Sequence, residues 1–401
     1  MLLTQRAIMR YLPAAEKWVL RVHQPVKLAN RYLVALLAIM GLSACGGSGG
    51  SSPSGTDVPD YLYQVPPQLS DGWLVSSLEA ESLDAQRLTD MMNGIRARGD
   101  DFFLRNILIV KSNRLVFEEY FGDTDRNTIS HQQSATKSIV SAIYGIAESN
   151  GLVGPTDSTL FGYFPEYQNL STTDKEAIEV QHVLTMTPGL AWNENSSPTF
   201  GAENDNIAAY ASNNYIWHVL QKDLVTVPGT EWNYNSGCPM LLAGIIRNQT
   251  GLHIDEFGDQ YLFQPLGITG ARWEYQADGL PLATGGLWIK ARDAAKIGQL
   301  FLDGGIWNGQ QVISADWVDR SLTSYASPRN GVGYGYLWWT QQRASHRIWF
   351  AAGYGGQLII IVPAHEVTIV INADYTRDTN EVGQREAQIW SLLTDFILPA
   401  I

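Results

Sequence analysis

The sequence has little cysteine and comparatively little positive charge. Its 401 residues include two cysteines, Cys45 and Cys238, which excludes a fold held together by several disulfides. There are 27 lysines and arginines against 40 acidic residues, giving a formal net charge of -13. A nucleic-acid binder needs clustered cations to neutralise phosphates, so we expect no nucleic-acid partner. The hydrophobic content of 45% is nevertheless enough for a large core.

Three familiar functional signatures are also missing from the part of the chain that we expect to fold. A zinc site beginning at His365-Glu366 would need a second histidine where Ile369 stands. There is no Gly-x-Ser-x-Gly elbow, and the glycine-rich stretch 331–335 runs into aromatic residues instead of opening a helix. Zinc hydrolysis and dinucleotide binding are therefore disfavoured, and we predict that the protein needs neither a metal nor a cofactor.

The N-terminus is organised like a secretory signal. Six basic residues precede an apolar run over residues 32–42, which is shorter than the roughly 20 residues that span a bilayer. The junction Leu-Ser-Ala-Cys45 resembles the lipobox of bacterial lipoproteins, in which the cysteine becomes the acylated first residue. This resemblance implies a signal peptide over residues 1–44 and a lipid on Cys45. The basic segment is long for a signal, so translation begins either at Met1 or downstream, for example at Met9.

The residues after Cys45 indicate a flexible tether. Residues 45–59 are rich in glycine and serine, and few of their side chains can pack. We expect a folded body over residues 60–401 that is lipid-anchored in the periplasm. The outer membrane is favoured because Gly46 replaces the aspartate associated with inner-membrane retention. Without residues 1–44 the chain has 21 basic against 39 acidic residues, so the body is markedly acidic.

Sheet patterns occur at both ends of the body, and helical patterns lie between them. Strands are predicted in a hairpin over residues 106–120 and again within residues 347–372, and helices at 83–98 and 381–396. Helical patterns and polar loops dominate from about 128 to 268. We therefore predict an α/β protein of the α+β type. Its antiparallel sheet is flanked by helices and completed by both ends of the chain, with an all-α subdomain inserted over about 128–268.

The tetrad Ser134-Ala-Thr-Lys137 opens one of these helices and can supply a nucleophile with a base. Apolar residues follow at helical spacing until Asn150-Gly151, which is typical of a helix end. Residues three apart share a helix face, so the Lys137 amine can reach the Ser134 hydroxyl. Burial and the positive end of the helix dipole both favour a neutral Lys137 that can accept a proton. The Ser134 N–H can also face an oxyanion.

Two later loops can complete such a site. Tyr234 lies in a loop before the apolar helix that we predict to open at Pro239, and its phenol can carry a proton between nucleophile and leaving group. Gly353 and Tyr354 join two predicted strands, where flanking glycines let a backbone N–H approach a ligand closely. We predict the Tyr354 N–H as the second oxyanion donor.

These motifs together resemble the serine β-lactamase and penicillin-recognising enzyme superfamily. The resemblance is to the branch with class C β-lactamases, family VIII esterases and 6-aminohexanoate-dimer hydrolase, and it covers nearly the whole body. Beyond Ser134–Lys137 and Tyr234–Ser236, the segments that carry it are 183–190, 283–287, 291–298 and 333–339. It implies a β-lactamase/transpeptidase-like fold, an antiparallel sheet flanked by helices plus an all-α subdomain, with the active site between them.

The sequence departs from the β-lactamase pattern at two motifs. The Lys-Thr-Gly motif, whose cation helps to hold a substrate carboxylate, is replaced by Ala351-Ala352-Gly353. The second motif reads Tyr-Asn-Ser, so Ser236 stands where the family has an amide that contacts the substrate. Both changes resemble the esterase and oligomer-hydrolase members. We therefore predict oxyanion or substrate contacts for Ser134, Ser236, Gly353 and Tyr354.

The sequence supports a serine hydrolase that acts on a small ester, amide or peptide-like substrate. Ser134 is the predicted nucleophile, Lys137 the base and Tyr234 the proton relay. One alternative is a β-lactamase or D,D-peptidase of the cell wall, and another is a non-catalytic envelope-binding lipoprotein. A Ser-His-Asp arrangement would use His131, although a structural role at the helix start is the commoner outcome for such a histidine. The loop acids Glu194, Glu203 and Asp205 can instead select cationic or polar substrates.

Overall fold

The computed structural model describes residues 60–99, 103–194, 203–376 and 381–401. The predicted signal peptide, Cys45 and the linker over 45–59 all lie outside these residues, so the division of the chain into signal, linker and body stays a prediction. Residues 62–401 form one unit, and the fold described below is that of this unit. None of the helices described is both long and apolar enough to cross a bilayer.

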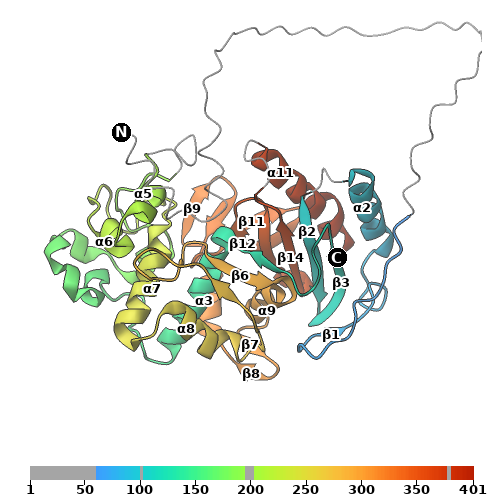
Figure 1. Ribbon diagram of the computed structural model, residues 1–401, viewed down its shortest axis with the longest axis horizontal. Helices are drawn as coiled ribbons and strands as arrows, with labels where there is room; N and C mark the ends of the chain where they lie inside the picture. Colours follow the sequence, from blue (N-terminus) through green and yellow to red (C-terminus); the bar gives the residue numbers. More distant parts are fainter. Residues whose placement is uncertain (1–59, 100–102, 195–202, 377–380) are drawn as a thin grey trace, which may run out of the picture. The chain divides into compact units, whose positions relative to one another are not determined.

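A nine-stranded sheet in the order β1-β3-β2-β14-β13-β12-β11-β10-β9 dominates the body (Figure 1). Neighbouring strands are antiparallel except for β1 and β3. As predicted, both ends of the chain complete the sheet, because β2 pairs with β14 at its centre. The strands are β1 Leu74–Val75, β2 Leu104–Lys111, β3 Arg114–Tyr120, β9 Ala326–Arg329, β10 Val332–Tyr334, β11 Trp339–Arg343, β12 His346–Gly353, β13 Gln357–Val362 and β14 Val367–Ala373.

Local turn chemistry explains the hairpin between β2 and β3. Ser112 and Asn113 both have positive φ, 47° and 64°, as a two-residue turn of type I′ requires. This turn matches the right-handed twist of the strands, and asparagine tolerates the left-handed conformation better than most residues. The hairpin predicted over residues 106–120 is therefore confirmed.

Helices cover both faces of the sheet. Helix α9 (Ala291–Leu302) packs so closely on one face that a Cβ at Gly298 would lie 2.6 Å from Thr368 of β14. On the other face Trp390 of helix α11 (Val382–Leu392) meets Phe350 of β12, with ring centroids 5.1 Å apart. Since neither face is open to solvent, β13 is apolar on both sides and all of its residues are buried.

A group of helices lies on one side of the large sheet (Figure 1). Helix α3 stands between the two, because it packs against α7 and α8 on one side and against β12 on the other. A small sheet of β4 (Ile129–His131), β6 (Leu287–Lys290) and β5 (Arg272–Trp273) leads into α3. The helices of the group are α3 Thr136–Ser149, α4 Val180–Leu184, α5 Asp205–Ala211, α6 Tyr215–Leu220, α7 Gly237–Thr250 and α8 Ile254–Gly258.

The remaining elements pack around these two groups. Helix α7 begins at Gly237, two residues before the predicted start at Pro239, and proline is tolerated there because the first N–H groups of a helix have no internal partner. The other elements are α2 Ala85–Ala97, β7 Ile306–Trp307, β8 Gln310–Gln311 and α10 Ala315–Ser321.

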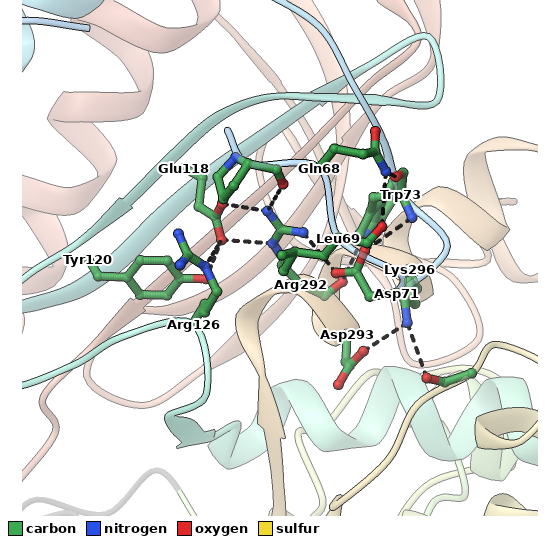
Figure 2. Close-up of polar contacts among 12 residues, drawn as sticks. Gln68, Leu69, Asp71, Trp73, Glu118, Tyr120, Arg126, Arg292, Asp293 and Lys296 are labelled. Atoms are coloured by element: carbon green, nitrogen blue, oxygen red, sulfur yellow. Dashed lines mark hydrogen bonds and ion pairs between the residues drawn. The ribbon is translucent and has the colours of Figure 1, made fainter. Parts of the chain in front are cut away.

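A buried arginine of α9 binds both the sheet and a segment near the start of the body. Figure 2 shows the Arg292 guanidinium of α9 between two carboxylates. Its Nε and Nη2 donate to the two oxygens of Glu118 in β3 at 2.8 and 2.7 Å, and Nη1 donates to Asp71 at 2.8 Å. Trp73 returns a hydrogen bond to the Arg292 carbonyl at 3.1 Å. Segments that are far apart in the sequence are therefore joined by charge-assisted bonds.

Candidate active site

The predicted nucleophile lies where a short 3-10 helix, Gln133–Ala135, runs into α3. Ser134 is partly exposed. The residue before it, Gln133, has a positive φ of 49°, which costs a non-glycine residue about 1–3 kcal/mol. Its N–H donates to Nδ1 of His131 at 3.0 Å. The turn before Ser134 is thus strained and held by a side chain.

Lys137 meets Ser134 as the spacing predicted. Its Nζ lies 2.9 Å from the Ser134 Oγ and also donates to the carbonyl of Thr284 at 2.5 Å. The lysine side chain is buried, with 2% of the residue exposed. Burial disfavours the ammonium and lowers the pKa of Lys137 to about 8, although the Glu194 carboxylate acts in the opposite direction. Roughly a tenth of Lys137 is therefore neutral at about pH 7, and more at higher pH.

Tyr234 completes a triangle with these two residues. The Lys137 Nζ lies 5.1 Å from the centroid of the Tyr234 ring, and the Ser134 side chain is near enough to the phenol to influence its pKa. Burial raises the pKa of Tyr234, the Glu194 carboxylate raises it further, and the Ser134 side chain acts in the opposite direction. The group is consequently a neutral phenol at physiological pH. Trp232 and Trp339 pack against its ring, with centroid distances of 6.1 Å each.

The set of Trp192, Trp217, Trp232, Trp338 and Trp339 includes three tryptophans with different surroundings. Trp338 is fully buried against Phe301, and Trp217 lies 41% exposed on α6. Trp192 donates its indole N–H to Glu194 at 2.8 Å. Only Trp232 and Trp339 of that set pack directly on Tyr234 within the described part of the chain.

Glu194 is held rigidly beside the site. One carboxylate oxygen accepts from the Ser236 N–H at 2.8 Å, and the other accepts from the Ser236 hydroxyl at 2.5 Å. Ser236 is 1% exposed, so the hydroxyl that we predicted to contact substrate has a buried protein partner here. Asp205 instead binds the backbone N–H of Asn193 at 2.6 Å and pairs with Lys222. Of the three loop acids, Glu194 is the one whose charge acts on both Lys137 and Tyr234.

The loop that carries Gly353 and Tyr354, called the oxyanion loop below, lies directly beside the turn that carries Ser134. Gly353 ends β12, and a Cβ at this position would lie 2.2 Å from the carbonyl oxygen of Gln132. Only glycine allows this approach without a backbone shift. The next residues continue the loop, and the Gly355 N–H donates to Glu386 of α11 at 2.8 Å. Tyr354 is partly exposed between these two anchor points.

His131 does not complete a Ser-His-Asp arrangement. Its Nδ1 accepts from Gln133, and its Nε2 lies 3.5 Å from the Glu274 carboxylate, so both ring nitrogens are engaged away from the Ser134 hydroxyl. Sequence reasoning missed the contributions of Thr284 and Glu386. The segment of Thr284 carried the family resemblance. The group that accepts from Lys137 is a backbone carbonyl, however, and since every residue has one, residue type does not reveal it. No cluster of three or more metal-binding side chains exists among the residues that the structure describes.

Comparison with known proteins identifies the relatives of this chain. The family described as Beta-lactamase matches residues 105–393, more than half of the chain. A 6-aminohexanoate-dimer hydrolase from Paenarthrobacter ureafaciens is 27% identical over 255 residues, which cover 59% of this chain. The match spans 61% of that relative's own length.

Solved structures share the fold at lower identity. A candidate 6-aminohexanoate-dimer hydrolase from Bacillus anthracis is 22% identical with a TM-score of 0.63, over 76% of this chain and 82% of that protein. A family VIII carboxylesterase is 12% identical with a TM-score of 0.58, over 77% of this chain and 97% of that protein. The sheet flanked by helices is therefore the β-lactamase/transpeptidase-like fold that the sequence motifs predicted.

Proposed function

Because the chain belongs to the β-lactamase family, we propose that it is a serine hydrolase that cleaves an ester or amide bond through an acyl-enzyme on Ser134. The observation that carries this proposal is the 2.9 Å contact between the Lys137 amine and the Ser134 hydroxyl, with the Tyr234 ring 5.1 Å from the same amine. A nucleophile with an adjacent base and an adjacent proton carrier is the arrangement that acyl transfer requires.

The reaction follows from the protonation states of the three groups. Neutral Lys137 accepts the Ser134 proton while Oγ attacks the substrate carbonyl carbon. The N–H groups of Ser134 and Tyr354 donate to the oxyanion of the tetrahedral intermediate. The Tyr234 phenol then relays a proton to the leaving group, which departs as the alcohol or amine. Water, deprotonated through the same groups, attacks the acyl-enzyme and releases the acid.

The substrate class follows from what the site lacks. Ala351-Ala352-Gly353 offers no cation at the position where β-lactamases hold a substrate carboxylate. The names of the 6-aminohexanoate-dimer hydrolase and carboxylesterase relatives support a linear amide or ester instead. We therefore place small linear esters and amides before β-lactams and cell-wall peptides as substrates. Covalent labelling by a fluorescent penicillin, at a rate above that of a fluorophosphonate, would reverse this order.

The proposal is tested by removing the nucleophile. The soluble body, residues 60–401, is assayed with p-nitrophenyl esters and linear amides, and its Ser134→Ala variant is compared with it. We expect the variant to lose hydrolysis and fluorophosphonate labelling at least about 1,000-fold while its unfolding transition is unchanged. Equal hydrolysis by both proteins would refute the role of Ser134. A body that neither hydrolyses nor labels would support the non-catalytic binding alternative.

A further inference from the structure

We propose that His131 is a positioning residue for the nucleophile: its imidazole fixes the backbone before Ser134 and links it to the segments that carry Thr284 and Tyr354. This inference rests on the proposed function, because it assigns a supporting role to a residue that does not itself touch the reacting atoms. Its evidence is the position of one buried ring among three segments of the candidate site.

The first contact fixes the strained turn. His131 ends β4, and its Nδ1 accepts the N–H of Gln133, two residues ahead, at 3.0 Å. Gln133 has a φ of 49°, a conformation that a non-glycine residue keeps only when its surroundings impose it. An Nδ1 that accepts a hydrogen bond leaves the proton of the neutral ring on Nε2. The same hydrogen bond therefore fixes the tautomer of His131 and the backbone that leads into Ser134.

The second contact reaches the segment that holds the lysine. The Nε2 of His131 lies 3.5 Å from one oxygen of Glu274, and the other oxygen accepts from the Trp288 indole at 3.1 Å. The Glu274 backbone N–H donates to the carbonyl of Gly286 at 2.9 Å, and its carbonyl accepts from Leu282 at 2.8 Å. These bonds bracket Thr284, the residue whose carbonyl accepts from Lys137.

The third contact reaches the oxyanion loop. The His131 ring lies 5.1 Å from the ring of Tyr375 and 4.8 Å, edge-on, from that of Trp288. Tyr375 in turn packs against Gly355, so closely that a Cβ added at Gly355 would lie 2.6 Å from the Tyr375 Cβ. Since His131 is 7% exposed, it has little freedom to leave this position. The His131 side chain therefore contacts residues that position the nucleophile, the base and the predicted oxyanion donor.

Two substitutions separate the functions of the two ring nitrogens. In His131→Asn the amide oxygen stands near the position of Nδ1 and can accept from an N–H two residues ahead, as in an Asx-turn. In His131→Gln the amide reaches toward Glu274 but leaves the Gln133 N–H without its acceptor. We expect His131→Gln to lower kcat about 100-fold with KM changed less than about threefold, because a nucleophile displaced by about 1 Å loses that much. We expect His131→Asn to keep kcat within about threefold of the original protein.

His182 supplies the matched control. Its Nδ1 also accepts a local backbone N–H, that of Glu179, at 3.1 Å, but in helix α4. The same Asn and Gln substitutions at His182 should leave kcat similar in both variants. Equal kcat for His131→Asn and His131→Gln, both close to the original protein, would overturn the inference. So would a similar Asn–Gln difference at His182.

A structural readout keeps the test independent of catalysis. Crystal structures of the two His131 variants report the φ of Gln133 and the position of the Ser134 Oγ. A changed Gln133 backbone in His131→Gln, but not in His131→Asn, supports the inference. An unchanged turn in both variants overturns it, even if the original protein proves to have no hydrolase activity. Failure of the proposed function is recognised separately, by a body that is inert toward substrates and fluorophosphonates.

Discussion

Lys137 is subject to two opposing influences, and their balance predicts the pH dependence of the reaction. Burial lowers its pKa to about 8, whereas the nearby Glu194 carboxylate favours the ammonium. The neutral amine is the reactive base, so kcat/KM for a neutral ester should rise with pH through about 8 and then level off. Below that pKa it should fall about tenfold per pH unit. A profile that stays flat between about pH 6 and about pH 9 would contradict the role of Lys137 as the base.

Glu194 allows the electrostatic part of this balance to be isolated. Its carboxylate raises the pKa of both Lys137 and Tyr234 while it accepts two hydrogen bonds from Ser236. Glu194→Gln keeps an acceptor of similar shape but removes the charge. We expect the rising limb of the kcat/KM profile to move to lower pH, since Lys137 then loses its proton more readily. A limb at the original pH, with the fold intact, would show that this charge does not control the base.

The residues of the candidate site differ in how far the sequence could reveal them. The contact between Ser134 and Lys137 is local, because helical spacing alone brings side chains three apart together. The contact between Glu194 and Ser236 joins residues 42 positions apart, and no periodicity predicts such a pair. The Thr284 carbonyl is still harder to foresee, since every residue has one. Residue type and spacing thus identify reactive groups but not the groups that hold them.

The contacts of helix α9 with β3 and with the first residues of the body give a prediction about stability. Arg292→Met removes the bidentate partner of Glu118, whose side chain is 1% exposed, and leaves it the longer 3.9 Å contact with Arg126. Removing one member of a buried ion pair costs about 3–5 kcal/mol, because the remaining charge stays in a poorly solvated place. We expect a loss of that size in the free energy of unfolding, measured by urea denaturation of the body followed by circular dichroism.

An exposed ion pair provides the comparison. Arg87 and Asp84 lie 3.6 Å apart at the start of α2, with side chains 43% and 47% exposed. Arg87→Met should cost less than about 1 kcal/mol, because water and salt screen the pair. If the two variants lost stability equally, the buried network around Arg292 would have no special part in holding the first residues of the body.

The elements differ in predictability for a similar reason. The strands β2, β13 and β14 were predicted because each contains a long apolar run, and β3 because a turn signal joins its apolar residues to β2. At the other side of the sheet, β9 and β10 are only four and three residues long, and they include serine, proline and glycine. Their strand conformation depends on the pairing of β10 with β11 and of β9 with β10, which the sequence of each segment does not encode.

At the scale of the whole molecule, the prediction concerns the cellular location of the activity. We propose that the acidic body is tethered to a membrane through a lipid on Cys45, as the Leu-Ser-Ala-Cys45 junction suggests. Such a tether matters for function because a glycine- and serine-rich linker confines the site near the envelope without fixing its orientation. Substrates would then be those that reach the periplasm.

Substitution at the two cysteines tests this tether. In the full chain, Cys45→Ala should abolish incorporation of an alkyne-labelled fatty acid and move the protein from the membrane to the soluble fraction, because the acyl chains supply the membrane affinity. Cys238→Ala is the matched control, since Cys238 is buried in α7 and cannot accept a lipid in the folded body. Its fractionation should match the original protein. Labelling that persists in Cys45→Ala would exclude this cysteine as the lipid site, and release by Cys238→Ala alone would point to misfolding instead of lost acylation.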